Sequence, residues 1–330
     1  MNRKVSVAPM MDCTDKHERY FLRLISKNVL LYTEMIVSEA IDKGDKAKLL
    51  SFNIEEKPVA LQLGGSSPKL LSNAAKIGEE FGYDEINLNL GCPSKKVQKN
   101  KFGACLIKEP NLVGDCLNEM LVKTSLPVTV KTRIGYDQVD DYEHLYNFIN
   151  LLKSTGVKTF IIHARKAMLG KFTPKQNLNI PPLKYEMVYK LKEDFKDLEI
   201  IINGGINSSE QIKSHLEKVD GAMIGRSVYH SPYLLEDIEK NIFDNHETPS
   251  RKEIVEKLVV YLRKEVKKGT RVNQIMRHTL GLFHGQTGSN FWKRYLSKNM
   301  CVRQADIRKI DHIIDKVKLN HVTQSPGQFD

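Results

Sequence analysis

Short apolar runs rich in Val and Ile recur along the first three quarters of the chain. Strands that are buried on both faces of a parallel sheet have this continuous hydrophobic character. The runs lie far enough apart to leave room for a helix between successive strands. We expect strands at residues 5–11, 30–37, 58–65, 85–92, 127–134, 158–165, 199–205 and 221–227.

Amphipathic helical stretches separate these runs, at residues 68–81, 142–155, 185–195 and 208–218. Pro68 suits the first position of a helix, and Asn207 or Ser208 suits an N-cap. Eight strands that alternate with helices predict an α/β fold, a (β/α)8 TIM barrel. An open doubly wound sheet is the alternative. It often carries a GxGxxG turn after its first strand, which this chain lacks.

The pattern changes after residue 242. Strand-like runs disappear, and helical periodicity predicts helices at residues 250–268, 272–284, 289–299 and 304–318, followed by a tail at 322–330. The chain of 330 residues is therefore expected to form a barrel over residues 1–242 and a smaller all-α domain over residues 243–330.

Charge distinguishes the two expected domains. Residues 243–330 carry 17 Lys and Arg against 9 Asp and Glu, whereas the other 242 residues carry 34 against 31. A basic domain beside a nearly neutral one indicates a polyanion such as nucleic acid as partner. The alternative is that the protein is mildly basic without any such partner.

The cysteines and the hydropathy of the chain bear on its compartment, on metal binding and on membrane insertion. The five cysteines are odd in number and scattered, which indicates a reducing compartment, hence the cytoplasm. Their spacing, and that of the histidines, predicts no metal site. No apolar run approaches the roughly 18 residues of a membrane span.

The segment 87–94 is the most informative one for function. Asn87 and Asn89 fit a packed core poorly, but they suit a strand end that lines a site for a polar ring. Cys92 follows directly, at the carboxyl end of the strand, where barrel enzymes carry their chemistry. The alternative is an incidental buried cysteine in a turn.

Other strand ends carry polar residues that could surround one planar heterocycle, namely Gln62, Lys131 and His163. The last two strands end in Gly-rich segments whose backbone could approach a phosphate, and the loops after strands seven and eight are the usual phosphate site of this fold. The residues concerned are Asn203, Gly204, Gly205, Gly225 and Arg226. A heterocycle and a phosphate together suggest flavin mononucleotide (FMN).

At these strand ends the chain resembles the tRNA-dihydrouridine synthase family. Segments 8–11, 61–65, 87–94, 131–133 and 203–205 match it in order and spacing, and the resemblance runs from about residue 5 to about residue 296. Segments 163–167, 173–177, 180–183 and 277–285 resemble the A subfamily, the tRNA-dihydrouridine(20/20a) synthases. That subfamily implies FMN as cofactor, NADPH as reductant and uridines 20 and 20a of the tRNA D-loop as substrate.

The resemblance also implies residue roles. Pro9, Met10 and Met11 would lie against the flavin ring, and Gln62, Lys131 and His163 would hydrogen-bond it. Asn203, Gly204, Gly205, Gly225 and Arg226 would bind its phosphate, Asn89 would contact the uridine, and Cys92 would donate a proton. Lys175, Leu178, Lys293 and Arg294 are the candidate tRNA contacts. The subfamily pattern has arginine where this chain has Leu178 and Asn290.

The implied reaction is chemically consistent with these residues. Reduction of uracil needs a hydride at C6 and a proton at C5, and a thiol with an ordinary pKa near 8.5 can supply the proton at neutral pH. The target base must leave its stack, at a cost of a few kcal/mol. Two alternatives remain: a flavoenzyme that reduces a free pyrimidine, and a tRNA-binding protein without activity. Trp292 could stack on a nucleotide or pack in the core of the helical domain.

Overall fold

The computed structural model describes residues 1–170 and 172–300, and these divide into two compact units. The first unit comprises Met1–Lys16 and Val29–Gly225. The second comprises His17–Asn28 and the described residues from Arg226 onward. The boundary expected at residues 242/243 falls inside the second unit, between two of its helices. That residues 1–242 bind flavin and residues 243–330 bind tRNA stays a prediction.

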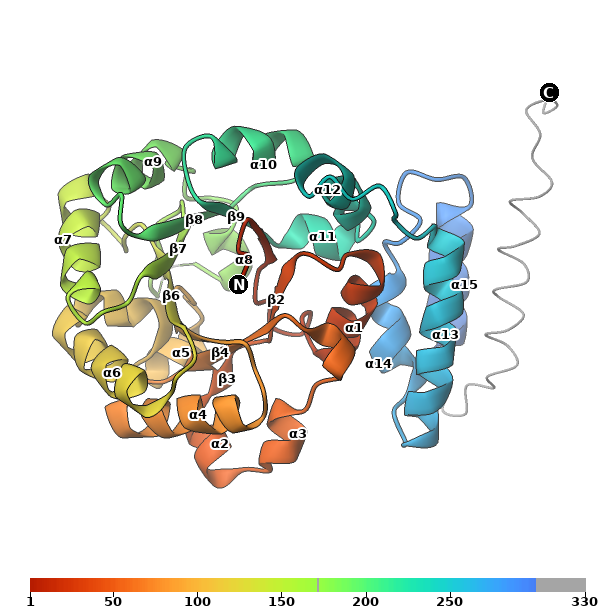
Figure 1. Ribbon diagram of the computed structural model, residues 1–330, viewed down its shortest axis with the longest axis horizontal. Helices are drawn as coiled ribbons and strands as arrows, with labels where there is room; N and C mark the ends of the chain where they lie inside the picture. The colour runs from red at the N-terminus through yellow and green to blue at the C-terminus, as the bar shows by residue number, and fades with distance from the viewer. Residues whose placement is uncertain (171, 301–330) are drawn as a thin grey trace. The chain divides into compact units, whose positions relative to one another are not determined.

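The first unit is a closed parallel barrel (Figure 1). The strands pair in the order β2-β1-β9-β8-β7-β6-β5-β4-β3, and β2 also pairs with β4, which closes the ring. The predicted (β/α)8 barrel is confirmed, with β3 as a short additional piece. The strands are β1 (Val5–Val7), β2 (Leu30–Tyr32), β3 (Ile36–Val37), β4 (Val59–Gly64), β5 (Glu85–Leu90), β6 (Val128–Arg133), β7 (Thr159–His163), β8 (Glu199–Asn203) and β9 (Gly221–Ile224).

The strand predicted at residues 30–37 is broken into β2 and β3. Both pieces pair with β4: Tyr32 lies opposite Ala60, and Ile36 lies opposite Leu63. The chain advances four residues between these pairs while β4 advances three, so one residue bulges out of the ladder. The prediction of one continuous strand is therefore wrong at this point.

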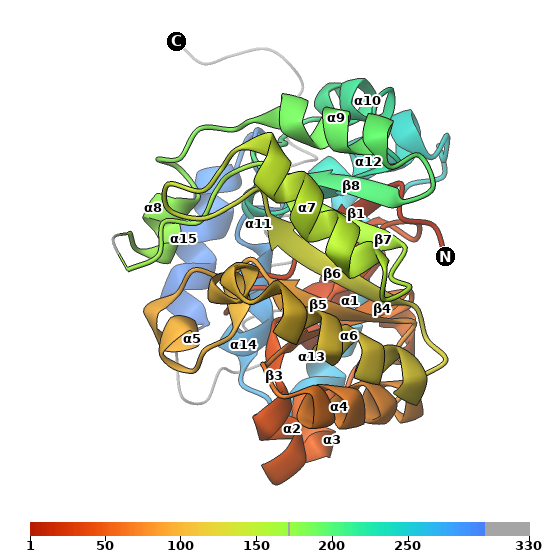
Figure 2. The ribbon, with the colours of Figure 1, turned by 90° about the vertical axis from the view of Figure 1, so that its left-hand side faces the viewer.

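Helices surround the strands of the first unit (Figure 2). They are α2 (Ser38–Lys43), α3 (Lys46–Leu50), α4 (Pro68–Glu80), α5 (Lys95–Lys99), α6 (Pro110–Lys123), α7 (Tyr142–Lys153), α8 (Pro174–Asn177), α9 (Tyr185–Asp194) and α10 (Ser209–Leu216), with 3-10 turns at Ile54–Glu56 and Gly103–Lys108. The side chains of Ser67 and Ser208 cap α4 and α10 by accepting backbone N–H groups. The four predicted barrel helices are confirmed to within two residues at each end.

The inside of the barrel is partly apolar and partly polar. A buried apolar cluster consists of Ala8, Leu30, Tyr32, Ala60, Ile161, Ile201 and Met223. Polar side chains from the same strands are equally buried, among them Glu85, Asn87 and Thr129, each with no exposed surface. Buried polar groups need hydrogen-bond partners, so these residues are the part of the core that requires an explanation.

The second unit is helical. It contains α1 (Lys16–Ile25) from its second residue onward, α11 (Arg226–His230), α12 (Leu234–Ile242), α13 (Arg251–Lys267), α14 (Val272–Met276), a 3-10 turn (Arg277–Thr279) and α15 (Ser289–Asn299). The predictions for 250–268 and 289–299 are confirmed, but helical structure predicted to residue 284 ends at Thr279. Cys301, the helix predicted at 304–318 and the tail at 322–330 lie outside the described residues.

Trp292 packs in the core of this second unit. It is 1 % exposed, its indole N–H donates to the Thr279 carbonyl at 2.8 Å, and its ring lies against Phe283. Of the two interpretations of this tryptophan, the structure therefore supports core packing. None of the helices within residues 1–170 and 172–300 has both the length and the apolar character needed to span a bilayer.

Candidate active site at the carboxyl ends of the barrel strands

Cys92 lies in a loop that is held at both sides. Asn89 Oδ1, at the end of β5, accepts the backbone N–H groups of Gly91 at 3.2 Å and Cys92 at 3.0 Å. The Cys92 carbonyl accepts the N–H of Ala104 at 3.0 Å. Gly103 has φ +74°, and a Cβ there would lie 2.7 Å from the Cys92 carbonyl oxygen. The backbone of the loop is thus fixed, while Cys92 itself stays partly exposed.

Arg133 adds a further constraint on this loop, and the sequence analysis assigned it no role. It ends β6 and is almost fully buried. Its Nε donates to the Gly91 carbonyl at 2.8 Å, and its Nη1 donates to the carbonyls of Lys166 at 3.1 Å and Asn177 at 3.3 Å. Burial lowers the pKa of Arg133 to about 10. The signal was its place in the 131–133 motif, two residues after Lys131, which was expected in the site.

Lys131 is a buried cation two residues earlier on β6. Its Nζ donates to Asn203 Oδ1 at 3.0 Å, and Asn203 Nδ2 donates to the Met223 carbonyl at 2.7 Å. Burial, and then repulsion by Arg133, lowers the pKa of Lys131 to about 7. Among the residues that the structure describes, no carboxylate forms an ion pair with this ammonium group. β6 and β8 therefore bring Lys131 and Asn203 into contact, two residues for which the sequence had suggested separate roles.

Gln62 and Asn89 form a second polar pair, on β4 and β5. Asn89 Nδ2 donates to Gln62 Oε1 at 2.8 Å, and Gln62 Nε2 donates to Asn87 Oδ1 at 2.8 Å. Gln62 is 1 % exposed and Asn89 is 8 % exposed. The two asparagines that the sequence singled out thus differ in position: Asn89 is at the strand end, whereas Asn87 lies deeper in the barrel.

Two consecutive glycines follow β8 in left-handed conformations. Gly204 has φ +118° and Gly205 has φ +75°. A Cβ on Gly204 would lie 2.6 Å from the ring of His163, so the backbone of this turn lies directly against the buried His163 side chain. The Gly204 carbonyl accepts the Tyr185 hydroxyl at 2.6 Å, which fixes the turn. Only glycine fits at position 204.

The remaining predicted residues of the first unit lie at or near the same strand ends. A Cβ on Gly225, after β9, would lie 3.6 Å from Met10 Sδ, so the loop after β1 approaches the end of β9. Pro9 and Met10 are partly exposed and Met11 is 55 % exposed. Lys175 is exposed on α8, and Leu178 follows that helix as its C-cap.

Three predicted residues belong to the second unit. Arg226 is the first residue of α11, and Lys293 and Arg294 lie on α15. Lys293 is partly exposed and Arg294 is exposed. Their predicted contacts with a phosphate or with tRNA stay predictions.

The residues at the strand ends fit a flavin mononucleotide. A buried ammonium group whose side-chain partner is a neutral amide is costly unless a bound group brings compensating negative charge. Lys131 is such a group. Gly204 and Gly205 provide a turn whose backbone a phosphate can approach closely.

Comparison with known proteins agrees with this geometry. The chain matches the family model for dihydrouridine synthase (Dus) over residues 6–318. The tRNA-dihydrouridine(20/20a) synthase of Synechocystis sp. is 51 % identical over 304 residues, which is 91 % of this chain and 90 % of the relative. The protein of the same name from Escherichia coli K12 is 50 % identical over 316 residues, 95 % of this chain and 91 % of the relative.

A solved structure shares the fold at low sequence identity. The complex of 2-naphthoyl-CoA reductase with 2-naphthoyl-CoA superposes with a TM-score of 0.55 and 11 % identity, and the match covers 73 % of this chain and 50 % of the other. The family match covers most of the chain and includes the Cys92 loop, Lys131 and the turn at Gly204. With relatives about half identical along almost their whole length, this chain belongs to the dihydrouridine synthase family.

Proposed function

We propose that the carboxyl end of the barrel binds FMN and that the protein reduces uridines 20 and 20a of the tRNA D-loop. Reduction of uridine in tRNA to dihydrouridine is the activity of the family to which the chain belongs. The observation that carries the cofactor and site assignment is Lys131, a buried cation near the Cys92 loop whose pKa is lowered to about 7. Such a group is suited to stabilise a partner that gains negative charge.

Cys92 is the proton donor in this proposal. The chemistry that FMN supplies when bound is a hydride for C6 of uracil. Cys92 gives its Sγ proton to C5 from the opposite face of the ring and regains a proton from water. Asn89 and Arg133 hold the loop so that the thiol stays in one place. Asn89 Nδ2 uses one hydrogen for Gln62, and its other hydrogen can donate to a carbonyl of uracil.

The other predicted residues complete the proposal. Gln62, Lys131 and His163 hydrogen-bond the flavin ring, and Pro9, Met10 and Met11 lie against it. Asn203, Gly204, Gly205, Gly225 and Arg226 bind its phosphate. Lys175, Leu178, Lys293 and Arg294 contact tRNA. NADPH is the reductant, and the cytoplasm, where tRNA is found, is the location.

Complementation of cells that lack this protein tests the function. Dihydrouridine in their tRNA is mapped by mass spectrometry after expression of the wild-type chain, Cys92→Ala or Cys105→Ala. Cys105 is a matched control, since it is also a partly buried thiol, and its Sγ contacts only the Phe102 carbonyl among the described hydrogen bonds. We expect dihydrouridine at positions 20 and 20a with wild type and Cys105→Ala. With Cys92→Ala we expect almost none, because loss of the proton donor slows the reaction by about 100-fold or more.

Two results would contradict the proposal. Restoration of dihydrouridine by Cys92→Ala would remove the thiol from the mechanism. Purified wild-type protein without a flavin absorbance band near 450 nm, even after incubation with FMN, would remove the cofactor.

A further inference from the structure

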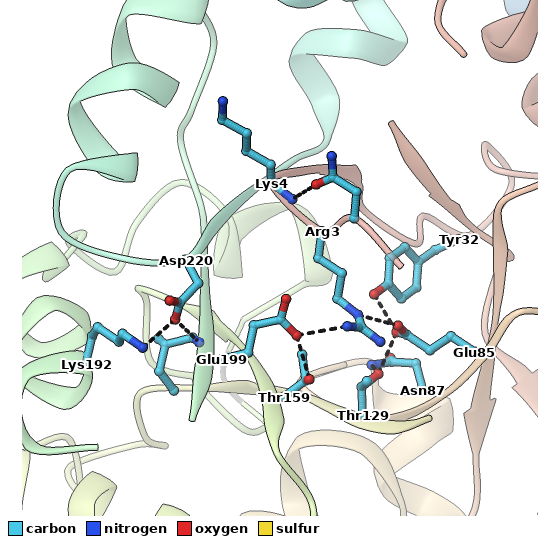
Figure 3. A network of polar contacts seen from close by, with 12 residues as sticks. Arg3, Lys4, Tyr32, Glu85, Asn87, Thr129, Thr159, Lys192, Glu199 and Asp220 are labelled. Atoms are coloured by element: carbon cyan, nitrogen blue, oxygen red, sulfur yellow. Dashed lines mark hydrogen bonds and ion pairs between the residues drawn. The ribbon is translucent and has the colours of Figure 1, made fainter. Parts of the chain in front are cut away.

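An unbroken series of side-chain hydrogen bonds runs inside the barrel from Glu85 to the Cys92 loop. Figure 3 shows its lower part, with Glu85, Thr129 and Asn87 side by side. We propose that Glu85, Thr129 and Asn87 are positioning residues, which orient Gln62 and Asn89 and thereby hold Cys92 in place. The functional meaning of this inference rests on the proposed role of Cys92.

Glu85 anchors the series at its lower end. Its carboxylate is fully buried and accepts donors from β2, β6 and the segment before β1. Arg3 Nε donates to Oε2 at 2.6 Å, while Tyr32 Oη and Thr129 Oγ1 donate to Oε1 at 2.7 and 2.6 Å. Arg3 also bridges to Glu199 at 2.9 Å. Burial and the Glu85 charge raise the pKa of Tyr32, so its hydroxyl remains a donor.

The charge of Glu85 determines the direction of every following bond. A carboxylate only accepts, so Thr129 gives it its single hydroxyl hydrogen, and Thr129 Oγ1 can then only accept. Its donor is Asn87 Nδ2 at 2.8 Å. Asn87 Oδ1 is therefore directed toward β4, where it accepts Gln62 Nε2 at 2.8 Å.

The same argument about donors and acceptors applies to the bonds between Gln62 and the Cys92 loop. Gln62 Oε1 accepts Asn89 Nδ2 at 2.8 Å, which leaves Asn89 Oδ1 to accept the N–H groups of Gly91 and Cys92. A backbone N–H only donates, so the upper end requires the orientation that the lower end imposes. The series thus has an acceptor at one end, the Glu85 carboxylate, and donors at the other end, the N–H groups of the Cys92 loop. Together these ends specify one orientation of the three side-chain amides between them, those of Asn87, Gln62 and Asn89.

Satisfying buried polar groups would be a simpler role for these residues. However, the neighbouring strands fill comparable interior positions with apolar residues, such as Ala60, Ile161 and Ile201. A polar network in a core is costly unless it is complete, and it specifies one structure when it is. A positioning role makes a distinct prediction: a break at Thr129 must change the Cys92 backbone, which lies four hydrogen bonds away along the series.

The experiment compares three variants of the FMN-loaded protein. Thr129→Val removes the hydroxyl with little change in shape and breaks the series. Thr129→Ser keeps the hydroxyl. Thr132→Val is the matched control, because Thr132 is equally buried on the same strand but alternates onto its other face, where its hydroxyl contacts the Arg133 carbonyl.

Two measurements are made on each variant. Hydrogen–deuterium exchange reports the protection of the Gly91 and Cys92 amides directly, without reference to activity. Steady-state kinetics with tRNA separate kcat from KM. We expect Thr129→Val to speed exchange at these two amides and to lower kcat, each by about tenfold, with KM for tRNA within about twofold of wild type. Thr129→Ser and Thr132→Val should resemble wild type.

The inference is overturned if exchange at Gly91 and Cys92 is the same in all three variants, or if Thr132→Val changes it as much as Thr129→Val. A Thr129→Val chain that does not fold is replaced by Asn87→Leu, which breaks the series one link nearer to Cys92. Altered exchange with unchanged kcat would retain the hydrogen-bond series but reject its catalytic purpose. Failure of the proposed function itself would appear in the Cys92→Ala test or as a lack of bound flavin, and not in the amide exchange of the Thr129 variants, so the two failures are distinguishable.

Discussion

Replacement of Lys131 by methionine should make the flavin-free protein more stable and at the same time inactive. Methionine has a similar length and no charge, so it removes the cost of burying an ammonium group. Lowering the pKa of Lys131 from 10.5 to about 7 corresponds to a cost of about 5 kcal/mol for the charged side chain at acidic pH. Loss of the hydrogen bond to Asn203 offsets about 1 kcal/mol of the gain.

The pH dependence identifies the cause of this effect. Because the pKa of Lys131 is lower in the folded protein, the unfolded chain binds the proton more tightly between pH 7 and about pH 10. Wild-type stability attributable to this group therefore rises with pH over that window. The stability advantage of Lys131→Met should be largest at pH 6 and should shrink by about 3 kcal/mol by pH 9.

Urea unfolding of the flavin-free wild-type and Lys131→Met proteins at pH 6 and pH 9 measures this difference. Taking the difference between the two proteins removes the contributions of all other titrating groups. An advantage that does not change with pH, or a variant less stable than wild type at pH 6, would refute the idea that Lys131 is a buried and uncompensated cation. Addition of FMN should stabilise wild type more than the variant.

Two further predictions concern the glycine turn and the second unit. Gly204→Ala should lose FMN on gel filtration, because its Cβ would lie 2.6 Å from the His163 ring. The control Gly82→Ala should retain FMN, since Gly82 is also at positive φ but has nothing within 4 Å of the added Cβ. Equal retention of FMN by the two variants would reject the turn as part of the site. Lys293→Ala with Arg294→Ala should weaken tRNA binding and lower the dependence of log Kd on log salt by about 2, one for each phosphate that is no longer neutralised. The control is Lys123→Ala at the C-terminal end of α6. This end of α6 leads into the amino end of β6, so it lies away from the strand ends that carry the site. An equal effect of Lys123→Ala on tRNA binding would show that the positive charge acts without a specific contact.

Long-range packing decided several features that local patterns had not predicted. The helix α1 follows β1 in the chain, yet it packs with the C-terminal helices, where Tyr20 stacks on Tyr261 at 3.8 Å. The strand expected at residues 30–37 is interrupted because its two halves must both align with β4. Arg133 acquired a role only when the Cys92 loop was seen to lie against it.

The sequence by itself determined the alternation of strands and helices, a helix start at Pro68 and another at Asn207 or Ser208, and the candidate site residues at the strand ends. These features depend on contacts within a few residues of the chain, so periodicity and capping residues reveal them. Only the tertiary structure decided that Asn87 lies below Asn89 and that Lys131 is buried without a carboxylate. These positions depend on hydrogen bonds between residues far apart in the chain. Thr129 and Glu85 are 44 positions apart, and Lys131 and Asn203 are 72 positions apart. Their geometry exists only after the barrel has closed.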